Sequence, residues 1–181
     1  MKVTPLSLPG LLLLELDCYP DERGFFLETY QQSRYQEAGI GSTFVQDNHS
    51  FSRKNVLRGM HFQEGNHQAK LVSVIQGTIF DVAVDIRPSS KTFGKWVGQV
   101  LDDHNHHQLF IPEGCAHGFC VLSDSAHVIY KVSTPFVSEM ERSFRFDDPT
   151  IAISWPISTF ILSAKDRKAP LFANLFSKEV P

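Results

Sequence analysis

Residues 78–86 read TIFDVAVDI, a segment in which every second side chain is apolar. Successive side chains of a β-strand point to opposite faces of the sheet, so this period of two predicts a strand. One face would carry Phe80, Val82, Val84 and Ile86, and the other Ile79, Asp81, Ala83 and Asp85. On a lone strand the face with the two carboxylates would most simply be solvated, whereas in a small barrel it can line a ligand cavity.

Comparable segments recur along the whole chain. They are rich in Val, Ile, Phe and Thr, and turn residues separate them, which is typical of an all-β protein. Helical signal is confined to residues 33–38, with Ser33 as a possible N-cap and Gly39 as a stop, and to the tail after Pro156. So many short strands predict a jelly roll or closed β-barrel with a few short helices. The predicted strands cover residues 11–17, 25–30, 44–52, 56–62, 69–75, 78–86, 96–101, 108–111, 116–122 and 128–133.

The composition limits the class of protein. A chain of 181 residues suits one domain, residues 1–181, and its 42% hydrophobic and 20% charged residues are ordinary for a folded protein. A formal net charge of -3 without any Lys/Arg run argues against nucleic-acid or membrane-surface binding, and no apolar run is long enough to span a bilayer. Cys18, Cys115 and Cys120 are an odd number without CxxC spacing, which argues against a disulfide framework and favours a cytoplasmic location.

Candidate catalytic side chains gather in two segments. Residues 58–63 (RGMHFQ) and 68–72 (QAKLV) place one base, His61, near two cations, Arg58 and Lys70, on neighbouring predicted strands. A single histidine in a β protein is usually a hydrogen-bonded structural residue. The same explanation covers His117, where the surrounding glycines could simply mark a tight bend. Only the combination of these residues raises a catalytic interpretation above the structural one.

Taken together, the motifs resemble the dTDP-4-dehydrorhamnose 3,5-epimerase family, whose members are cupin-type jelly rolls. The resemblance extends over nearly the whole chain, with its motifs in order and at compatible spacing. The matching motifs are DERGFFLE (21–28), FVQDN (44–48), RGMH (58–61), QAKLV (68–72), DVAVDIR (81–87), IPEG (111–114), AHGF (116–119), YK (130–131) and KD (165–166).

A metal enzyme is the first competing interpretation, because many cupins bind a metal through histidines and a glutamate. In this chain Gln63 occupies the position of the second histidine of the cupin HxH pair, and Lys70 occupies that of the glutamate. An ammonium group at a ligand position would repel a divalent ion. The resemblance therefore implies an enzyme without a metal or other cofactor, in which Lys70 stabilises an oxyanion.

The resemblance also assigns the catalytic roles. His61 would abstract a proton next to the sugar carbonyl, and Asp166 would orient its imidazole. Lys70 would stabilise the enolate oxygen, and Tyr130 would return a proton on the opposite face. The simpler alternatives are a surface lysine and a buried tyrosine with a structural hydroxyl bond. Asp81 and His117 would support the sugar and the charge pattern of the pocket.

Nucleotide binding is implied for a further set of residues. Arg23 and Arg58 have the forked guanidinium that suits a diphosphate, although either could be an ordinary surface charge. Arg23, Phe26 and Glu28 would enter the site from a neighbouring subunit, which implies a homodimer. The other residues matched to the nucleotide are Gln46 and Asn48.

Two departures from the family pattern leave the substrate partly open. Phe136 stands where the family usually has a tyrosine, so stacking is kept and a hydroxyl is lost, and Cys115 replaces a phenylalanine before Ala116. The implied activity is epimerisation of dTDP-4-dehydro-6-deoxy-D-glucose at C3 and C5 to dTDP-4-dehydro-L-rhamnose. The alternatives are inversion of one carbon only, another nucleotide carrier, or a cupin that binds a sugar nucleotide without chemistry.

Overall fold

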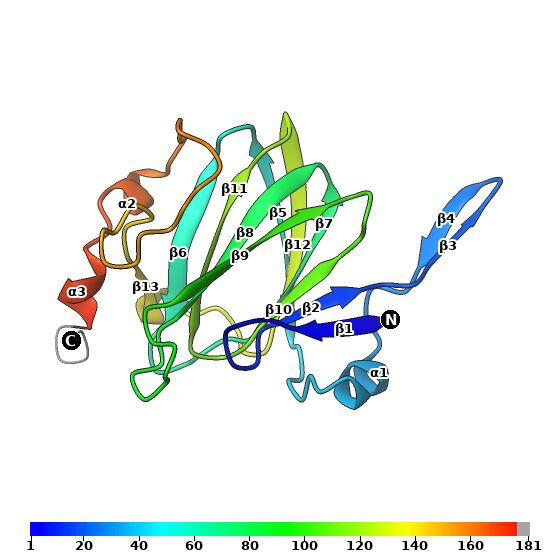
Figure 1. The fold of residues 1–181 in the computed structure, drawn as a ribbon, viewed down its shortest axis with the longest axis horizontal. Helices are drawn as coiled ribbons and strands as arrows, with labels where there is room; N and C mark the ends of the chain where they lie inside the picture. The colour runs from blue at the N-terminus through cyan, green and yellow to red at the C-terminus, as the bar shows by residue number, and fades with distance from the viewer. Residues whose placement is uncertain (177–181) are drawn as a thin grey trace.

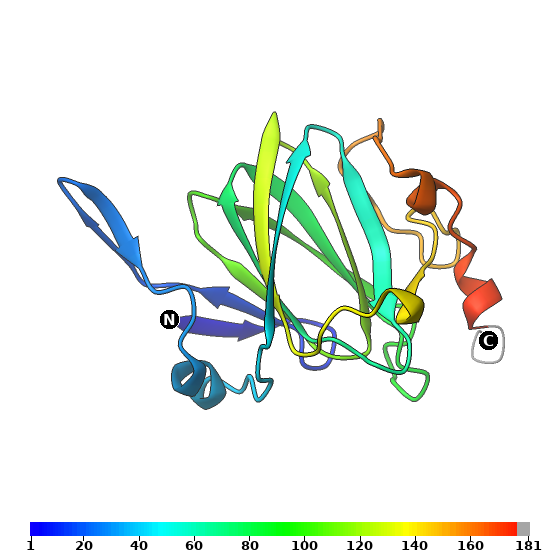
Figure 2. The ribbon, with the colours of Figure 1, turned by 180° about the vertical axis from the view of Figure 1, so that it is seen from behind.

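The computed structural model describes residues 1–176, in which two antiparallel sheets pack face to face (Figures 1 and 2). The six-stranded sheet has the order β1 (Lys2–Pro5), β2 (Leu12–Glu15), β10 (Gln108–Ile111), β7 (Lys70–Gln76), β12 (Ser125–Val132) and β5 (Gln46–Arg53). The five-stranded sheet has the order β13 (Glu141–Ser143), β6 (Leu57–Gln63), β11 (Cys115–Val121), β8 (Thr78–Asp85) and β9 (Trp96–Asp102). The predicted jelly roll is confirmed, and the sheets do not close into a barrel.

The core between the sheets explains the alternation of strand β8. Its residues Ile79 and Ala83 pack against side chains of β7, β10 and β12 in the facing sheet. Its other face, with Val82 and Val84, packs under the C-terminal segment, including Phe172. Both faces of β8 are therefore buried, and the solvated carboxylate face expected of a lone strand does not form.

The two carboxylates of β8 are buried and hydrogen-bonded. Asp81 accepts from His117, whereas Asp85 accepts from Arg87, Ser90 and Thr92. Bonds from three side chains offset the cost of burying the Asp85 carboxylate. Of the two, Asp81 lies beside the candidate site and Asp85 has a structural environment.

Two glycines allow β6 and β11 to approach closely beside the candidate site. A Cβ atom added to Gly59, whose φ is +136°, would lie 2.6 Å from the Cα atom of Gly118. A Cβ atom on Gly118 would lie 2.6 Å from the sulfur of Met60. The pairing register between β11 and β6 shifts between His117 and Phe119, so the strand ladder is irregular at these glycines.

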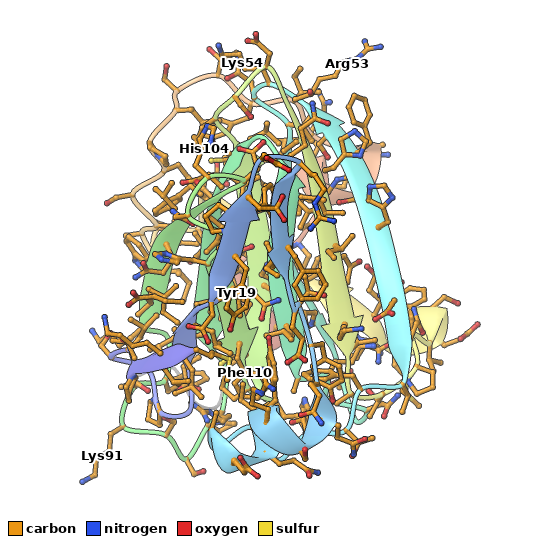
Figure 3. The ribbon with its side chains drawn as sticks, turned by 90° about the vertical axis from the view of Figure 1, so that its right-hand side faces the viewer. Tyr19, Arg53, Lys54, Lys91, His104 and Phe110 are labelled. Carbon is orange, nitrogen blue, oxygen red and sulfur yellow. The ribbon has the colours of Figure 1, made fainter. Side chains whose placement is uncertain are left out.

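A two-stranded arm projects from the body of the molecule (Figure 1). It consists of β3 (Cys18–Asp21) and β4 (Gly24–Leu27). In Figure 3 the arm points toward the viewer, with Tyr19 labelled. Tyr19, Phe25 and Phe26 are all exposed on this arm. The strand predicted at residues 25–30 is thus shorter and belongs to a separate hairpin, because residues 28–31 turn away toward α1.

The helices are short. They are α1 (Gln32–Glu37), α2 (Ala164–Arg167) and α3 (Phe172–Leu175), with one 3₁₀ turn at Ser138–Met140. The prediction that Ser33 caps the first helix is wrong, because the side chain of Gln31 accepts the bond from the Arg34 amide. No helix within residues 1–176 is long and apolar enough to cross a membrane.

Candidate active site

A cavity of about 380 Å³ opens between the two sheets. Both sheets contribute polar side chains to it, and the loop after β12 contributes an aromatic ring. From the five-stranded sheet come Arg58, His61, Phe62, Gln63, His117, Gly118, Phe119 and Glu141; from the six-stranded sheet and its loops come Gln46, Asn48, Ser50, Gln68, Lys70, Tyr130 and Phe136. A mostly concave site with converging polar groups is the usual form of a small-ligand site.

His61 and Asp166 form a dyad at one wall of the cavity. The Nε2 atom of His61 lies 2.5 Å from Oδ1 of Asp166, whose side chain is only 3% exposed. Burial alone would raise the pKa of Asp166, but hydrogen bonds from His61 and Ser163 and the charges of His61 and Lys165 outweigh it and lower that pKa. An ionised carboxylate can only accept, so Nε2 carries the proton and Nδ1 is the basic nitrogen.

A second histidine lies directly beside the dyad. In the antiparallel pairing of β11 with β6, His117 is the partner of His61. The Nε2 atom of His117 lies 2.9 and 3.0 Å from the two carboxylate oxygens of Asp81, and both side chains are buried. Asp81 therefore orients the His117 ring from behind, as Asp166 orients that of His61.

Lys70 approaches the cavity from the facing sheet, at the first residue of β7. Its residue is only 7% exposed, and burial lowers the pKa of its ammonium from 10.5 to about 8. The charges of Cys115 and Asp81 oppose this shift without cancelling it. A cation of this kind, held in a poorly solvated site, interacts strongly with negative charge that develops nearby.

Tyr130 also belongs to the six-stranded sheet, on β12, and it lines the same cavity as His61, which lies in the five-stranded sheet. Its pKa is raised, because burial and the charge of Glu141 together outweigh the opposing effect of Arg58. The phenol is therefore protonated at neutral pH and can act as a donor. The candidate base, His61, and the candidate acid, Tyr130, thus line one cavity from different sheets.

Comparison with known proteins identifies the family of this chain. A family model described as dTDP-4-dehydrorhamnose 3,5-epimerase matches residues 5–174. The chain belongs to this family. The resemblance drawn from the motifs is thereby confirmed.

Individual family members are similar over most of the chain. A dTDP-4-dehydrorhamnose 3,5-epimerase of Salmonella typhimurium is 52% identical over 174 residues, covering 94% of this chain and 95% of the relative. A Neisseria gonorrhoeae protein of the same name is 49% identical over 92% of this chain, which spans about half (51%) of that relative. The crystal structure of a Legionella pneumophila dTDP-6-deoxy-D-glucose-3,5-epimerase in complex with dTDP-4-keto-L-rhamnose superposes with a TM-score of 0.95 at 46% identity, covering 99% of this chain and 97% of that one.

Most residues proposed for the epimerase site on sequence grounds lie at the cavity. Arg58 is held there by bonds from Nε to Ser52 Oγ (2.9 Å) and from its terminal nitrogen to the Phe51 carbonyl (3.1 Å). Asp166 and Asp81 lie behind the histidines that they contact. The residues that line the cavity directly are Gln46, Asn48, Arg58, His61, Lys70, His117, Tyr130 and Phe136.

Three of the proposed residues lie away from the cavity of their own chain. Arg23 pairs with Asp21 at the tip of the arm, and Glu28 pairs with Arg34 of α1. Phe26 is 69% exposed and borders a different, more apolar hollow on the outer face of the six-stranded sheet. This position fits the expectation that they serve a neighbouring subunit, which stays a prediction.

Three glutamines at the cavity hold neighbouring loop backbone by hydrogen bonds. Gln63 donates to the carbonyls of Asn66 and Pro135 and accepts from the amide of Val137. Gln68 donates to the Thr134 carbonyl, and Gln46 accepts from the Phe136 amide. These bonds hold the loop that carries the Phe136 ring. Gln63 therefore has a loop-holding role at the position where other cupins have a metal ligand.

Other lining residues were missed because nothing in their local sequence marks them. Ser50 Oγ is buried without a hydrogen-bond partner among the described residues, and it faces the cavity from β5. Glu141 begins the short strand β13, which has no recognisable alternation. Within residues 1–176 no three His, Cys, Asp or Glu side chains are grouped as metal ligands.

Proposed function

We propose that this protein catalyses the epimerisation of dTDP-4-dehydro-6-deoxy-D-glucose at C3 and C5 to dTDP-4-dehydro-L-rhamnose. The observation that carries the proposal is that His61, which lies on one sheet and is bonded to Asp166 of α2, and Tyr130, which lies on the other sheet, line a single cavity. Inversion of a carbon requires a base on one face of the sugar and an acid on the other. Membership of the epimerase family supports the same reaction.

The chemistry follows from the acidity of hydrogens next to a carbonyl. In a 4-keto sugar the hydrogens on C3 and C5 are both α to C4, and removal of either gives an enolate with its charge on the C4 oxygen. Nδ1 of His61 takes the proton, and Asp166 stabilises the resulting imidazolium. The Lys70 ammonium stabilises the enolate oxygen, and Tyr130 delivers a proton to the opposite face of the carbon.

Substrate binding is assigned to the remaining polar and aromatic lining residues. Arg58 binds the diphosphate, Gln46 and Asn48 contact the nucleotide, and Phe136 stacks on it. Buried, carboxylate-bonded His117 shapes the sugar pocket together with Asp81. These assignments come from the family resemblance, and the position of the residues at the cavity supports them.

The protein is proposed to act as a homodimer in which each arm completes the partner's site. The arm exposes Tyr19, Phe25 and Phe26 to solvent in the single chain, and such a patch is costly unless another surface covers it. Arg23 and Glu28 would then extend the nucleotide site of the partner. A cytoplasmic location is likewise proposed, from three cysteines that are all free.

Two alternatives are separable from this proposal. An epimerase that inverts one carbon, or that acts on another nucleotide carrier, would use the same dyad. The departure from the family pattern at Phe136 leaves this alternative available. A cupin that only binds a sugar nucleotide would not need a carboxylate at hydrogen-bond distance behind His61, so the 2.5 Å contact favours the enzymatic proposal.

The decisive experiment is incubation with the dTDP-4-keto sugar in heavy water, followed by NMR. We expect deuterium at both C3 and C5 with inverted configuration at each. Label at one carbon only would select the single-carbon alternative, and the absence of label would select the binding protein. His61→Asn should lower the rate by about 10² to 10⁴, the usual worth of a general base, without loss of the fold.

A further inference from the structure

Helix α2 carries two neighbouring charged residues with different partners. Its four residues are Ala164–Arg167, and among them Asp166 contacts the His61 imidazole while Lys165 forms an ion pair with Glu141. A single helical turn is not stable by itself in water. Its position, and with it that of the Asp166 carboxylate, therefore depends on the contacts that it makes with the rest of the protein.

Glu141 is well placed to define that position. It begins β13, which pairs with β6 so that Glu141 is opposite Gln63 and Ser143 is opposite His61. The backbone that carries Glu141 is thus fixed, by sheet hydrogen bonds, relative to the backbone that carries His61. The ion pair between Glu141 and Lys165 joins β13 to α2. It therefore links the strand pair that carries His61 to the helix that carries Asp166, in addition to the direct contact between these two residues.

One side chain of the pair, that of Glu141, is partly buried, which distinguishes the pair from a fully exposed surface contact. The Glu141 side chain is 21% exposed and lines the cavity, while the Lys165 side chain is half exposed. Fully exposed pairs contribute little, because water competes and two flexible side chains must be ordered. A pair with one largely buried carboxylate is better held, and the charge of Lys165 also helps to lower the pKa of Asp166.

We infer that the Glu141–Lys165 ion pair is a positioning device that holds α2 against β13 and keeps the Asp166 carboxylate on Nε2 of His61. The inference rests on the proposed function, and it makes Glu141 and Lys165 positioning residues that act through Asp166. Without the pair, one attachment between α2 and the sheet is lost, and the carboxylate spends less time at the distance that stabilises an imidazolium. A direct contact between Lys165 and the substrate diphosphate is the competing role.

Kinetics of single variants separate these two roles. We expect Glu141→Gln and Lys165→Met each to lower kcat about 3- to 30-fold with little change in KM, because the dyad is impaired and binding is not. Lys165→Arg keeps the ion pair and should retain most of the rate. Lys168→Met is the matched control, since this exposed lysine at the C-cap of the same helix makes no ion pair within the described residues. A raised KM with unchanged kcat in Lys165→Met would assign the lysine to substrate binding and overturn the inference.

A double-variant comparison tests whether the pair acts through the dyad. In an Asp166→Asn background, Lys165→Met should cost almost nothing further, because the group that it positions has lost its charge. An undiminished loss in that background would overturn the inference.

A spectroscopic measurement makes the inference independent of turnover. The proton on Nε2 of His61, in its short bond to Asp166, should give a downfield NMR resonance that weakens or shifts in Glu141→Gln and Lys165→Met but not in Lys168→Met. If the wild-type protein lacks epimerase activity and the resonance responds as expected, the proposed function fails and the positioning role stands. If the resonance is unchanged in both variants, the positioning role is overturned even in an active enzyme.

Discussion

Replacement of Lys70 by methionine should stabilise the fold while it removes turnover. The ammonium is buried, and its pKa is lowered from 10.5 to about 8, so the folded protein holds a charge that the unfolded chain would hold more favourably. At 1.36 kcal/mol for each pKa unit, the shift corresponds to an upper limit of about 3 kcal/mol at pH 7. Methionine has a similar length and no charge, so it can occupy the site without this penalty.

The sign of the pH dependence follows from linkage. Between pH 8 and 10.5 the unfolded chain still binds the Lys70 proton and the folded protein has released it, so wild-type stability rises with pH in that window. The advantage of Lys70→Met should therefore be fully present below pH 8 and disappear by about pH 10.5.

Urea unfolding followed by circular dichroism, at one protein concentration and at pH 7 and 10, measures both quantities. Lys54→Met is the control, because that lysine is exposed in a surface pair with Asp124 and its loss should change the free energy of unfolding by less than about 1 kcal/mol. A Lys70→Met variant that is no more stable than wild type at pH 7 would refute the reasoning, since the ammonium would then bear no burial penalty. Retained epimerase activity in the same variant would refute the oxyanion role.

Three further outcomes are expected. The Tyr130→Phe variant should continue to exchange solvent deuterium into the substrate while inversion falls sharply, because His61 can return a proton only to the face from which it took one. Normal epimerisation in this variant would make Tyr130 a structural residue. Loss of both exchange and inversion would remove the support for a base and an acid on opposite faces of the sugar. Activity should survive a chelator, since Gln63 and Lys70 occupy the positions of metal ligands, and loss of activity with release of a stoichiometric metal would contradict this. Phe26→Ala should weaken the homodimer in sedimentation measurements, and an unchanged dimer would place the interface elsewhere.

Alternation and residue type made the long strands predictable. In β12 the buried residues Ala126, Val128 and Val132 lie on one face, which gives a period of two. Strands β8 and β11 are buried on both faces, so they are marked by their apolar residues more than by alternation. The short edge strands β1, β3 and β13 were missed because they are only three or four residues long, and β3 even contains Pro20. Their conformation comes from pairing with a neighbour, which leaves little mark in the strand itself.

Local capping was misjudged for a related reason. A serine before a helix is the commoner N-cap, yet the first turn of α1 is bonded by the side chain of Gln31, two residues before Ser33. The first residue of α1 depends on the path of the chain between the β3–β4 arm and the helix, and tertiary contacts determine that path.

The sequence by itself determined the all-β class and the chemical groups available, because side-chain period and residue type are local properties. Only the tertiary structure decided that Asp166 meets His61 across 105 positions, that Tyr130 stands on the opposite sheet, and that Lys70 loses its water. Distances between sheets and the depth of a charge depend on how all the strands pack together. For that reason the proposed site residues could be named from the sequence. The lowered pKa of Lys70 and the ion pair between Glu141 and Lys165 beside the dyad depend on the tertiary structure.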